Sequence, residues 1–242
     1  MSTIASNLQQ LRARIFAACT AAGRSPDSVL LLAVSKTFGA GAVGEAMAAG
    51  QYAFGENYLQ EAVTKMGEVG SLKVAAPANK LQWHCIGPIQ SNKSRLVAEH
   101  FDWAHTVDRL KIAQRLSEQR PTHLAPLQVC IQINIDGAAS KSGVMPDDAL
   151  ALVRDVAQLQ RLVVRGVMTI PEAAPDFEAQ KRLHTSAKTI FDEIKQAGLP
   201  GLAHFDTLSM GMSADLEAAI HAGSTMVRVG SAIFGSRAVL PA

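Results

Sequence analysis

The sequence is poor in the residues that mark several classes of protein. Only three of its 242 residues are cysteines, Cys19, Cys85 and Cys130, and they lie far apart without a CxxC motif or a Cys/His cluster. This spacing argues against a disulfide framework and against a zinc site, and it is typical of buried free thiols. We therefore expect no bound metal.

Long apolar runs and blocks of charge are also missing. No segment approaches the roughly 18 unbroken apolar residues of a membrane span. Arg12 and Arg14 interrupt the N-terminal pattern, so it does not read as a secretory signal. Charged residues make up 18%, and the formal net charge is +2 without a lysine/arginine block. This leaves no electrostatic footprint for nucleic acid or an anionic membrane. We expect a cytoplasmic protein with a small-molecule partner.

Apolar residues, at 48% of the chain, suffice for a sizeable core. Near the N-terminus they recur at spacings of three or four, as one stripe of an amphipathic helix. The residues of this stripe are Ile4, Leu8, Leu11, Ile15 and Cys19. The pattern predicts a helix within residues 1–25 that packs on the outside of the fold.

Short apolar runs then alternate with helical patterns, which is typical of βα units and a parallel sheet. We identify eight runs, at 29–36, 52–57, 81–87, 103–108, 127–135, 163–170, 205–211 and 225–230. Eight units predict an α/β fold of one domain spanning 1–242, a single (β/α)8 TIM barrel with the extra N-terminal helix. An open doubly wound sheet would have a Gly-rich phosphate turn after the first strand, and 35–41 matches neither known motif.

Lys36 closes the first apolar run. An ammonium held against such a strand loses hydration, which favours a free amine able to attack a carbonyl. Lys36 is therefore a candidate for forming a Schiff base. The alternative is a lysine that ends the strand and extends into solvent.

Small residues follow the last two runs, at 209–213 and 228–235. In this fold the loops after strands seven and eight frequently bind phosphate, through backbone N–H groups, hydroxyls and a helix N-terminus. The residues of that kind are Ser209, Gly211, Gly230 and Ser231. The alternative is two tight turns that need glycine for backbone reasons.

An amine and a phosphate site in one barrel suggest a phosphorylated aldehyde or ketone, either pyridoxal 5′-phosphate (PLP) or a sugar phosphate. Arg228 favours PLP, bound so that its ring is a weak electron sink. A guanidinium is a permanent donor and would keep a pyridine nitrogen unprotonated, whereas a carboxylate would strengthen the ring as an electron sink.

Seven short motifs carry a family resemblance along almost the whole chain. They lie at 33–36, 54–58, 84–93, 140–143, 166–170, 208–213 and 227–235. In these motifs the sequence resembles the pyridoxal phosphate homeostasis protein family, alanine-racemase-like barrels that lack the second domain of the racemase. One departure is Ser231, which stands where threonine is common in the family.

The resemblance implies PLP held as a Schiff base on Lys36, with Arg228 toward the ring nitrogen. It places Ser209, Gly230 and Ser231 on the phosphate and Asn57 in the pocket. Met168 contacts the ring or the barrel floor, or is plain core. His84 either orients the rim or is structural.

The implied function is intracellular PLP homeostasis or delivery to PLP-dependent apoenzymes, with no catalytic residue assigned. A weakly active amino-acid racemase stays open, but it needs a second base. The only tyrosines that could supply this base are Tyr52 and Tyr58. The eight units themselves extend to about Arg237.

A Schiff-base aldolase acting on a sugar phosphate is the third alternative. Its acid or base would be Glu56 or Asp108, the only acidic residues near the rim. Lys93 and Lys141 could guide the cofactor during transfer, or they are solvated charges. Without a second domain we expect a monomer.

Overall fold

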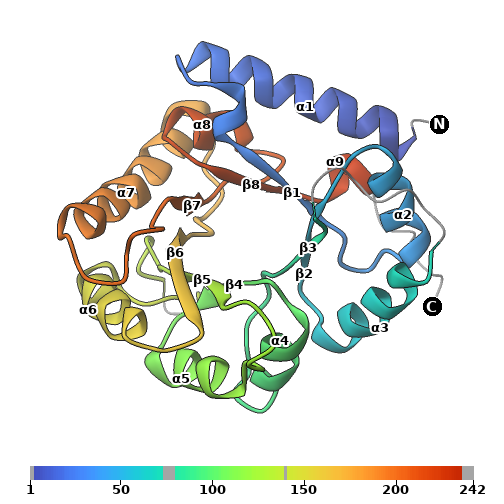
Figure 1. The fold of residues 1–242 in the computed structure, drawn as a ribbon. Helices are drawn as coiled ribbons and strands as arrows, with labels where there is room; N and C mark the ends of the chain where they lie inside the picture. Colours follow the sequence, from blue (N-terminus) through green and yellow to red (C-terminus); the bar gives the residue numbers. More distant parts are fainter. Residues whose placement is uncertain (1–2, 73–79, 139–140, 236–242) are drawn as a thin grey trace.

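The computed structural model describes residues 3–72, 80–138 and 141–235, and in it eight parallel strands close into a barrel in chain order (Figure 1). The strands are β1 (Leu30–Val34), β2 (Ala53–Glu56), β3 (Gln82–Cys85), β4 (Trp103–Val107), β5 (Leu127–Gln132), β6 (Leu162–Met168), β7 (Thr207–Ser209) and β8 (Met226–Val229). Each strand overlaps one of the eight predicted runs. The predicted α/β barrel is confirmed.

Helices surround the strands on the outside of the barrel (Figure 1). They are α2 (Ala40–Ala48), α3 (Leu59–Gly70), α4 (Ser94–His100), α5 (Leu110–Gln119), α6 (Pro146–Ala157), α7 (Phe177–Gln196), α8 (Leu216–His221) and α9 (Ser231–Phe234). The predicted extra helix is also present, as α1 (Ile4–Ala21), which contacts α2, α8 and α9. Its buried residues include Leu8, Leu11, Ile15 and Cys19, the stripe read from the sequence.

The strands end earlier than the apolar runs that predicted them. β1 pairs with β8 from Leu30 to Ala33 and ends at Val34. Beyond it the chain turns, because the Phe38 N–H donates to the Ser35 carbonyl at 3.0 Å. Residues past the strand ends therefore form a rim, and functional sites of this fold lie at that rim.

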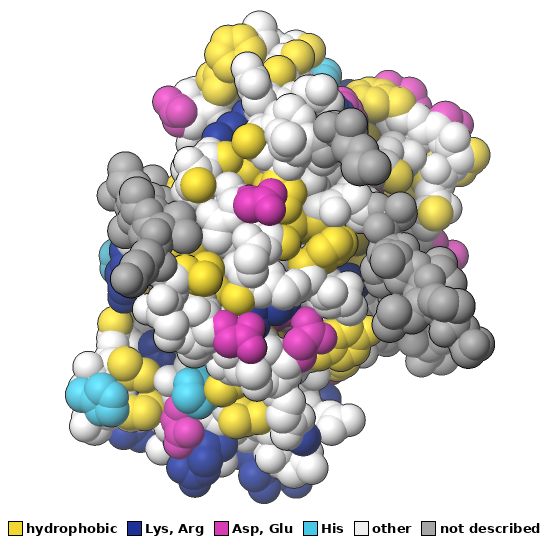
Figure 2. All heavy atoms as spheres, turned by 90° about the vertical axis from the view of Figure 1, so that its right-hand side faces the viewer, with side chains coloured by type: hydrophobic (Ala, Val, Ile, Leu, Met, Phe, Trp, Pro, Cys, Tyr) yellow, Lys and Arg dark blue, Asp and Glu magenta, His cyan; other side chains and the backbone are white. Residues whose placement is uncertain are grey.

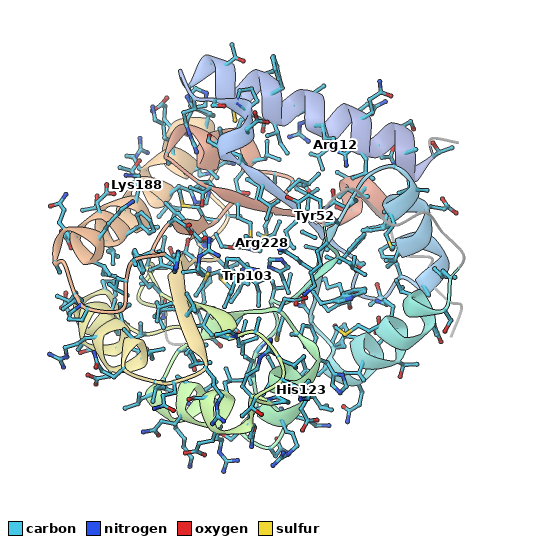
Figure 3. The ribbon with its side chains drawn as sticks, viewed as in Figure 1. Arg12, Tyr52, Trp103, His123, Lys188 and Arg228 are labelled. Atoms are coloured by element: carbon cyan, nitrogen blue, oxygen red, sulfur yellow. The ribbon has the colours of Figure 1, made fainter. Side chains whose placement is uncertain are left out.

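Apolar side chains pack in two places. One large cluster lies between the strands and the helices, and a smaller one consists of Leu32, Ala53, Trp103, Cys130, Met168 and Met226. Figure 3 shows Trp103 and Arg228 in the middle of the barrel, and both are at most 4% exposed. Cys19, Cys85 and Cys130 are buried and free, as predicted.

The side of the barrel that carries α2 and α3 faces the viewer in Figure 2. Acidic and apolar side chains are interspersed on this side with uncharged surface, and Lys and Arg side chains gather mainly along one edge. Within the described residues, none of the helices combines the length and apolar character needed to cross a membrane.

Candidate cofactor site

A cavity of about 750 Å³ lies at the C-terminal ends of the strands. Its lining comes from six segments of the chain, and the polar residues in it are Lys36, Thr37, Asn57, Ser213, Arg228 and Ser231. Ile86 and Ile170 supply apolar wall. Eight residues were predicted to bind the cofactor, and five of them line this one cavity. They are Lys36, Asn57, Arg228, Gly230 and Ser231.

Lys36 lies at this cavity with an exposed side chain, two residues beyond the end of β1. The expectation that its amine is desolvated against the strand is therefore wrong. The apolar run continues to Val34, but the backbone leaves the sheet there, so the lysine belongs to the rim. An exposed amine remains accessible to a ligand that enters from solvent.

Gly230 brings the end of β8 close to the end of β1. A Cβ at position 230 would come within 3.1 Å of the Val34 carbonyl oxygen. In the barrel these strands are neighbours, with Leu32 opposite Arg228 and Ala33 opposite Val229. The Lys36 loop, Arg228 and the turn at Gly230 therefore meet at one place on the rim.

Backbone donors without acceptors occur in the two loops that follow β7 and β8. Among the described residues, the N–H groups of Ser213, Ala214 and Ser231 have no hydrogen-bond acceptor, and all three residues line the cavity. Free N–H groups and hydroxyls in a turn suit an anionic ligand. Sequence reasoning missed Ser213 and Ala214, although Ser213 closes the 208–213 motif.

Arg228 is buried and held from inside the barrel. Its Nη1 donates to Ser209 Oγ and its Nη2 to the Thr169 carbonyl, both at 2.8 Å. Burial lowers the pKa of the guanidinium to about 10, so it remains a cation at neutral pH. Arginine has five N–H donors, and the other three leave it able to contact a ligand in the cavity.

Ser209 does not line the cavity, in contrast to its predicted place on a phosphate. It is fully buried, accepts from Arg228 and lies 3.0 Å from His105 Nδ1. The reason is the alternation of side chains along β7, which turns Ser209 into the barrel. Its hydroxyl holds the Arg228 side chain from the interior of the barrel.

His105 and His84 extend this hydrogen-bonded chain through the barrel. His84 Nδ1 and His105 Nε2 are 2.9 Å apart, so they share one hydrogen, and both rings are fully buried. Burial lowers the pKa of His84 to about 3 and that of His105 well below its ordinary value, so both are neutral. His84 is thus interior, and His105 was missed by sequence reasoning.

Gly211 and Met168 also lie outside the cavity lining. Gly211 has φ +93°, and a Cβ there would lie 2.5 Å from Ala219 Cβ, so the turn after β7 requires glycine. Its carbonyl accepts from the Arg228 N–H at 3.0 Å. Met168 is fully buried in the smaller apolar cluster. Met168 is thus part of the core, and Gly211 holds the backbone of Arg228.

Asn57 presents a buried oxygen, Oδ1, that has no hydrogen-bond partner in the part of the chain that the structure describes. Its backbone is fixed by Gly87, where a Cβ would lie 2.5 Å from the Asn57 carbonyl oxygen. A buried polar atom left without a partner is costly. A ligand with a donor in this position would satisfy it.

Lys93 and Lys141 lie beside the cavity and not in its lining. Lys93 Nζ donates to Gln60 Oε1 at 2.7 Å. Lys141 Nζ pairs with Asp136 at 2.9 Å and lines a neighbouring hollow of about 250 Å³ that shares Asn57. Both amines are engaged in the described structure.

Replacing Ser209 by alanine is expected to lower the free energy of unfolding by about 2 kcal/mol, because Arg228 and His105 would each lose a buried partner. Urea unfolding of the ligand-free protein measures this. Ser213→Ala is the matched control, since Ser213 is half-buried and its hydroxyl has no bond among the described residues. Equal stability of the two variants would contradict the supporting role of Ser209.

Known proteins resemble this chain over almost its whole length. The family model described as alanine racemase, N-terminal domain, matches residues 3–238. The chain is 55% identical over 237 residues to the pyridoxal phosphate homeostasis protein of Pseudomonas aeruginosa, covering 98% of this chain and 97% of that protein.

Solved structures show the same relationship. PipY of Synechococcus elongatus, whose structure has PLP bound, has a TM-score of 0.81 and 37% identity, with 96% of this chain and 100% of PipY covered. Alanine racemase of Clostridium difficile has a TM-score of 0.68 at 14% identity, with 93% of this chain and 56% of the racemase covered, which shows the fold alone. The barrel is of the alanine racemase N-terminal type. The chain belongs to the pyridoxal phosphate homeostasis protein family.

Proposed function

We propose that the protein binds pyridoxal 5′-phosphate as a Schiff base on Lys36 and acts as a PLP carrier in intracellular PLP homeostasis. The observation that carries this proposal is the composition of the cavity. One hollow of about 750 Å³ is lined by an accessible amine, a buried guanidinium and backbone N–H groups that have no acceptor among the described residues. These groups match an aldehyde, a pyridine nitrogen and a phosphate.

Each group would act on a different part of the cofactor. The N–H groups and hydroxyls of Ser213 and Ser231, beside Gly230, would hold the phosphate. Arg228 would donate to the ring nitrogen, with its orientation kept by Ser209 and Thr169. Asn57 Oδ1 supplies an acceptor that has no partner among the described residues.

Lys36 would form the covalent link. The lone pair of its neutral Nζ adds to the aldehyde carbon of the cofactor, and a C=N bond replaces the C=O bond. The carbonyl oxygen leaves as water with the two protons of the amine, so no redox partner is needed. The reverse reaction with water frees the cofactor, which suits a carrier.

The cavity favours a carrier over an enzyme. Among its described lining residues, Lys36 and Arg228 are the only titratable side chains. A racemase needs a second acid/base group opposite the lysine, and an aldolase needs one for its carbon chemistry. The carboxyl of Glu56 is fully buried and bonded to Lys65, and Asp108 does not line the cavity.

PLP-dependent apoenzymes are the proposed recipients of the cofactor. The carrier is proposed to act in the cytoplasm as a monomer, with residues 1–242 as a single PLP-binding domain. Analytical ultracentrifugation of the full chain tests the monomer. Transfer from the loaded carrier to an apoenzyme, faster than from free PLP at equal concentration, tests delivery.

The visible spectrum tests the binding proposal directly. The purified protein mixed with PLP should show the absorbance band of a Schiff base, and borohydride should remove this band and fix the cofactor on Lys36. Peptide mapping by mass spectrometry identifies the labelled lysine. A protein that takes up no PLP, or label on another lysine, would overturn the proposal.

Alanine turnover separates the carrier from the racemase. The PLP-loaded protein is expected to convert either alanine enantiomer far more slowly than the roughly 1–1,000 turnovers per second of typical enzymes. The reason is that a second base is missing from the described cavity lining. Chiral chromatography measures the opposite enantiomer. Turnover in that range would replace the carrier by the racemase.

Ser213→Ala is expected to weaken PLP binding about ten-fold, since a hydrogen bond from a hydroxyl to a charged phosphate is lost. Fluorescence titration measures the affinity. The effect should be equal for pyridoxine 5′-phosphate, which has the phosphate but no aldehyde. An unchanged affinity for both compounds would remove Ser213 from the phosphate site.

A further inference from the structure

We propose that Glu61 and Lys65 on α3, with Glu56 at the end of β2, are positioning residues that hold the backbone on both sides of Lys36. This inference rests on the proposed function, because it concerns how Lys36 is presented to the aldehyde. None of the three side chains is assigned a role by the fold or by the cavity lining described above.

The contacts of these side chains converge on the residues before and after Lys36. Lys65 Nζ donates to the Ser35 carbonyl at 2.9 Å, and the Ser35 hydroxyl donates to Glu56 Oε1 at 2.6 Å. On the other side, the Thr37 N–H donates to Glu61 Oε1 at 2.9 Å. Hydrogen bonds thus hold residues 35 and 37 in place, while the Lys36 side chain stays outside the cluster.

Lys65 ties the two acidic residues together. Its Nζ lies 2.8 Å from Glu56 Oε1 and 3.1 Å from Glu61 Oε1, and with the Ser35 carbonyl these three acceptors match the three donors of an ammonium. The side chains of Lys65 and Glu56 are 3% and 0% exposed. Lys65 is therefore a buried, fully bonded amine, and Lys36 is the amine at the cavity.

The backbone conformation at Thr37 needs this support. Thr37 has φ +68°, a left-handed value that is unfavourable for a β-branched residue. Strain of this kind persists only where neighbouring groups impose it. The bond from the Thr37 N–H to Glu61 is such a constraint, and it lies next to the lysine.

Packing supports the far end of the Lys36 loop, where Phe38 stacks on Phe234 with ring centroids 5.0 Å apart. Thr37 and Phe38 line the proposed cofactor cavity and also a second hollow of about 540 Å³, which Glu61, Lys65 and Glu68 line as well. The loop therefore separates two open spaces. At Ser35 and Thr37, on either side of Lys36, the hydrogen bonds of the cluster hold the backbone.

Glu61→Ala is the most informative change, because Glu61 is partly exposed and its removal leaves the buried Lys65–Glu56 pair in place. The expected result is a Schiff-base formation constant with PLP that is about ten-fold lower, since the loop loses a hydrogen bond to a charged acceptor. Affinity for pyridoxine 5′-phosphate, which has no aldehyde, should stay unchanged. Glu61→Gln keeps an acceptor oxygen and should restore most of the loss.

The ligand-free protein offers an independent readout. Hydrogen exchange measured by mass spectrometry should become faster at the Thr37 N–H in Glu61→Ala and not in Glu68→Ala. Glu68 is the matched control, because it is an exposed glutamate of the same helix without a hydrogen bond to the loop. Thermal unfolding of both variants shows how the loss of one negative charge from α3 changes the stability of the protein.

The outcomes separate the inference from the proposed function. A wild-type protein that forms no Schiff base would overturn the function itself. A wild-type protein that does so, with Glu61→Ala equal to Glu68→Ala in formation constant, would overturn the positioning role alone. Equal losses for PLP and pyridoxine 5′-phosphate would also overturn it, because they would indicate general damage to the cavity.

Discussion

Replacing Lys36 by alanine is expected to abolish the visible band and the borohydride-fixed label completely, because no other amine lines the described part of the cavity. Some PLP should still bind through its phosphate and ring, with a dissociation constant at least about ten-fold higher. Absorbance and equilibrium dialysis measure the two quantities separately. The proposed site thus makes two contributions, one covalent and one not.

Lys111→Ala is the matched control for this prediction. Lys111 is an exposed lysine of α5, remote from the cavity lining, and its loss should leave band and affinity unchanged. A band of full strength in Lys36→Ala would assign the Schiff base to another lysine. Complete loss of PLP binding would contradict a separate phosphate anchor at Ser213, Gly230 and Ser231.

The barrel could be predicted because its strands carry their signal locally. A strand covered on the outside by helices and on the inside by the barrel core is apolar along its length, so each one stands out as a short apolar run. β5, at Leu127–Gln132, is an example within the predicted 127–135. The strand ends were overestimated, because apolar and small residues continue after the sheet hydrogen bonds stop.

The orientation of rim residues could not be read in the same way. Ser209 and Ser213 occur in one motif, but Ser209 is the last residue of β7 and points into the barrel, whereas Ser213 follows the turn at Gly211 and faces the cavity. Lys36 showed the same problem. The apolar run indicated burial, and the early end of β1 gives exposure.

Buried polar partners were the least predictable part of the site. His105 lies 104 positions from Ser209 and 21 from His84, so their contacts depend on how the strands meet across the barrel. Lys65 was not singled out by any motif, and it is buried on α3 as the ion-pair partner of Glu56 on β2. One sequence gives no sign of such pairings.

The neutral histidines inside the barrel predict a loss of stability in acid. The pKa of His84 falls from 6.5 to about 3 on folding, because the ring is fully buried. Below pH 6.5 the unfolded chain therefore binds one more proton at this site than the native protein does. The stabilising effect is complete above pH 6.5 and is lost as the pH falls toward 3.

One proton taken up only by the unfolded chain corresponds to a loss of about 1.4 kcal/mol for each pH unit, and His105 acts in the same direction as His84. Urea unfolding of the ligand-free protein at several pH values between 7 and 4 measures how the free energy of unfolding changes with pH.

In His84→Asn this change with pH should be smaller by the amount that corresponds to about one proton. The variant is also less stable at neutral pH, because His105 loses its partner. His123→Asn is the control, since His123 is exposed at the edge of the molecule (Figure 3) and its removal should leave the slope as it is. A wild-type stability that stays constant from pH 6.5 to 4 would show that the interior accepts protons, and that burial does not hold His84 and His105 neutral.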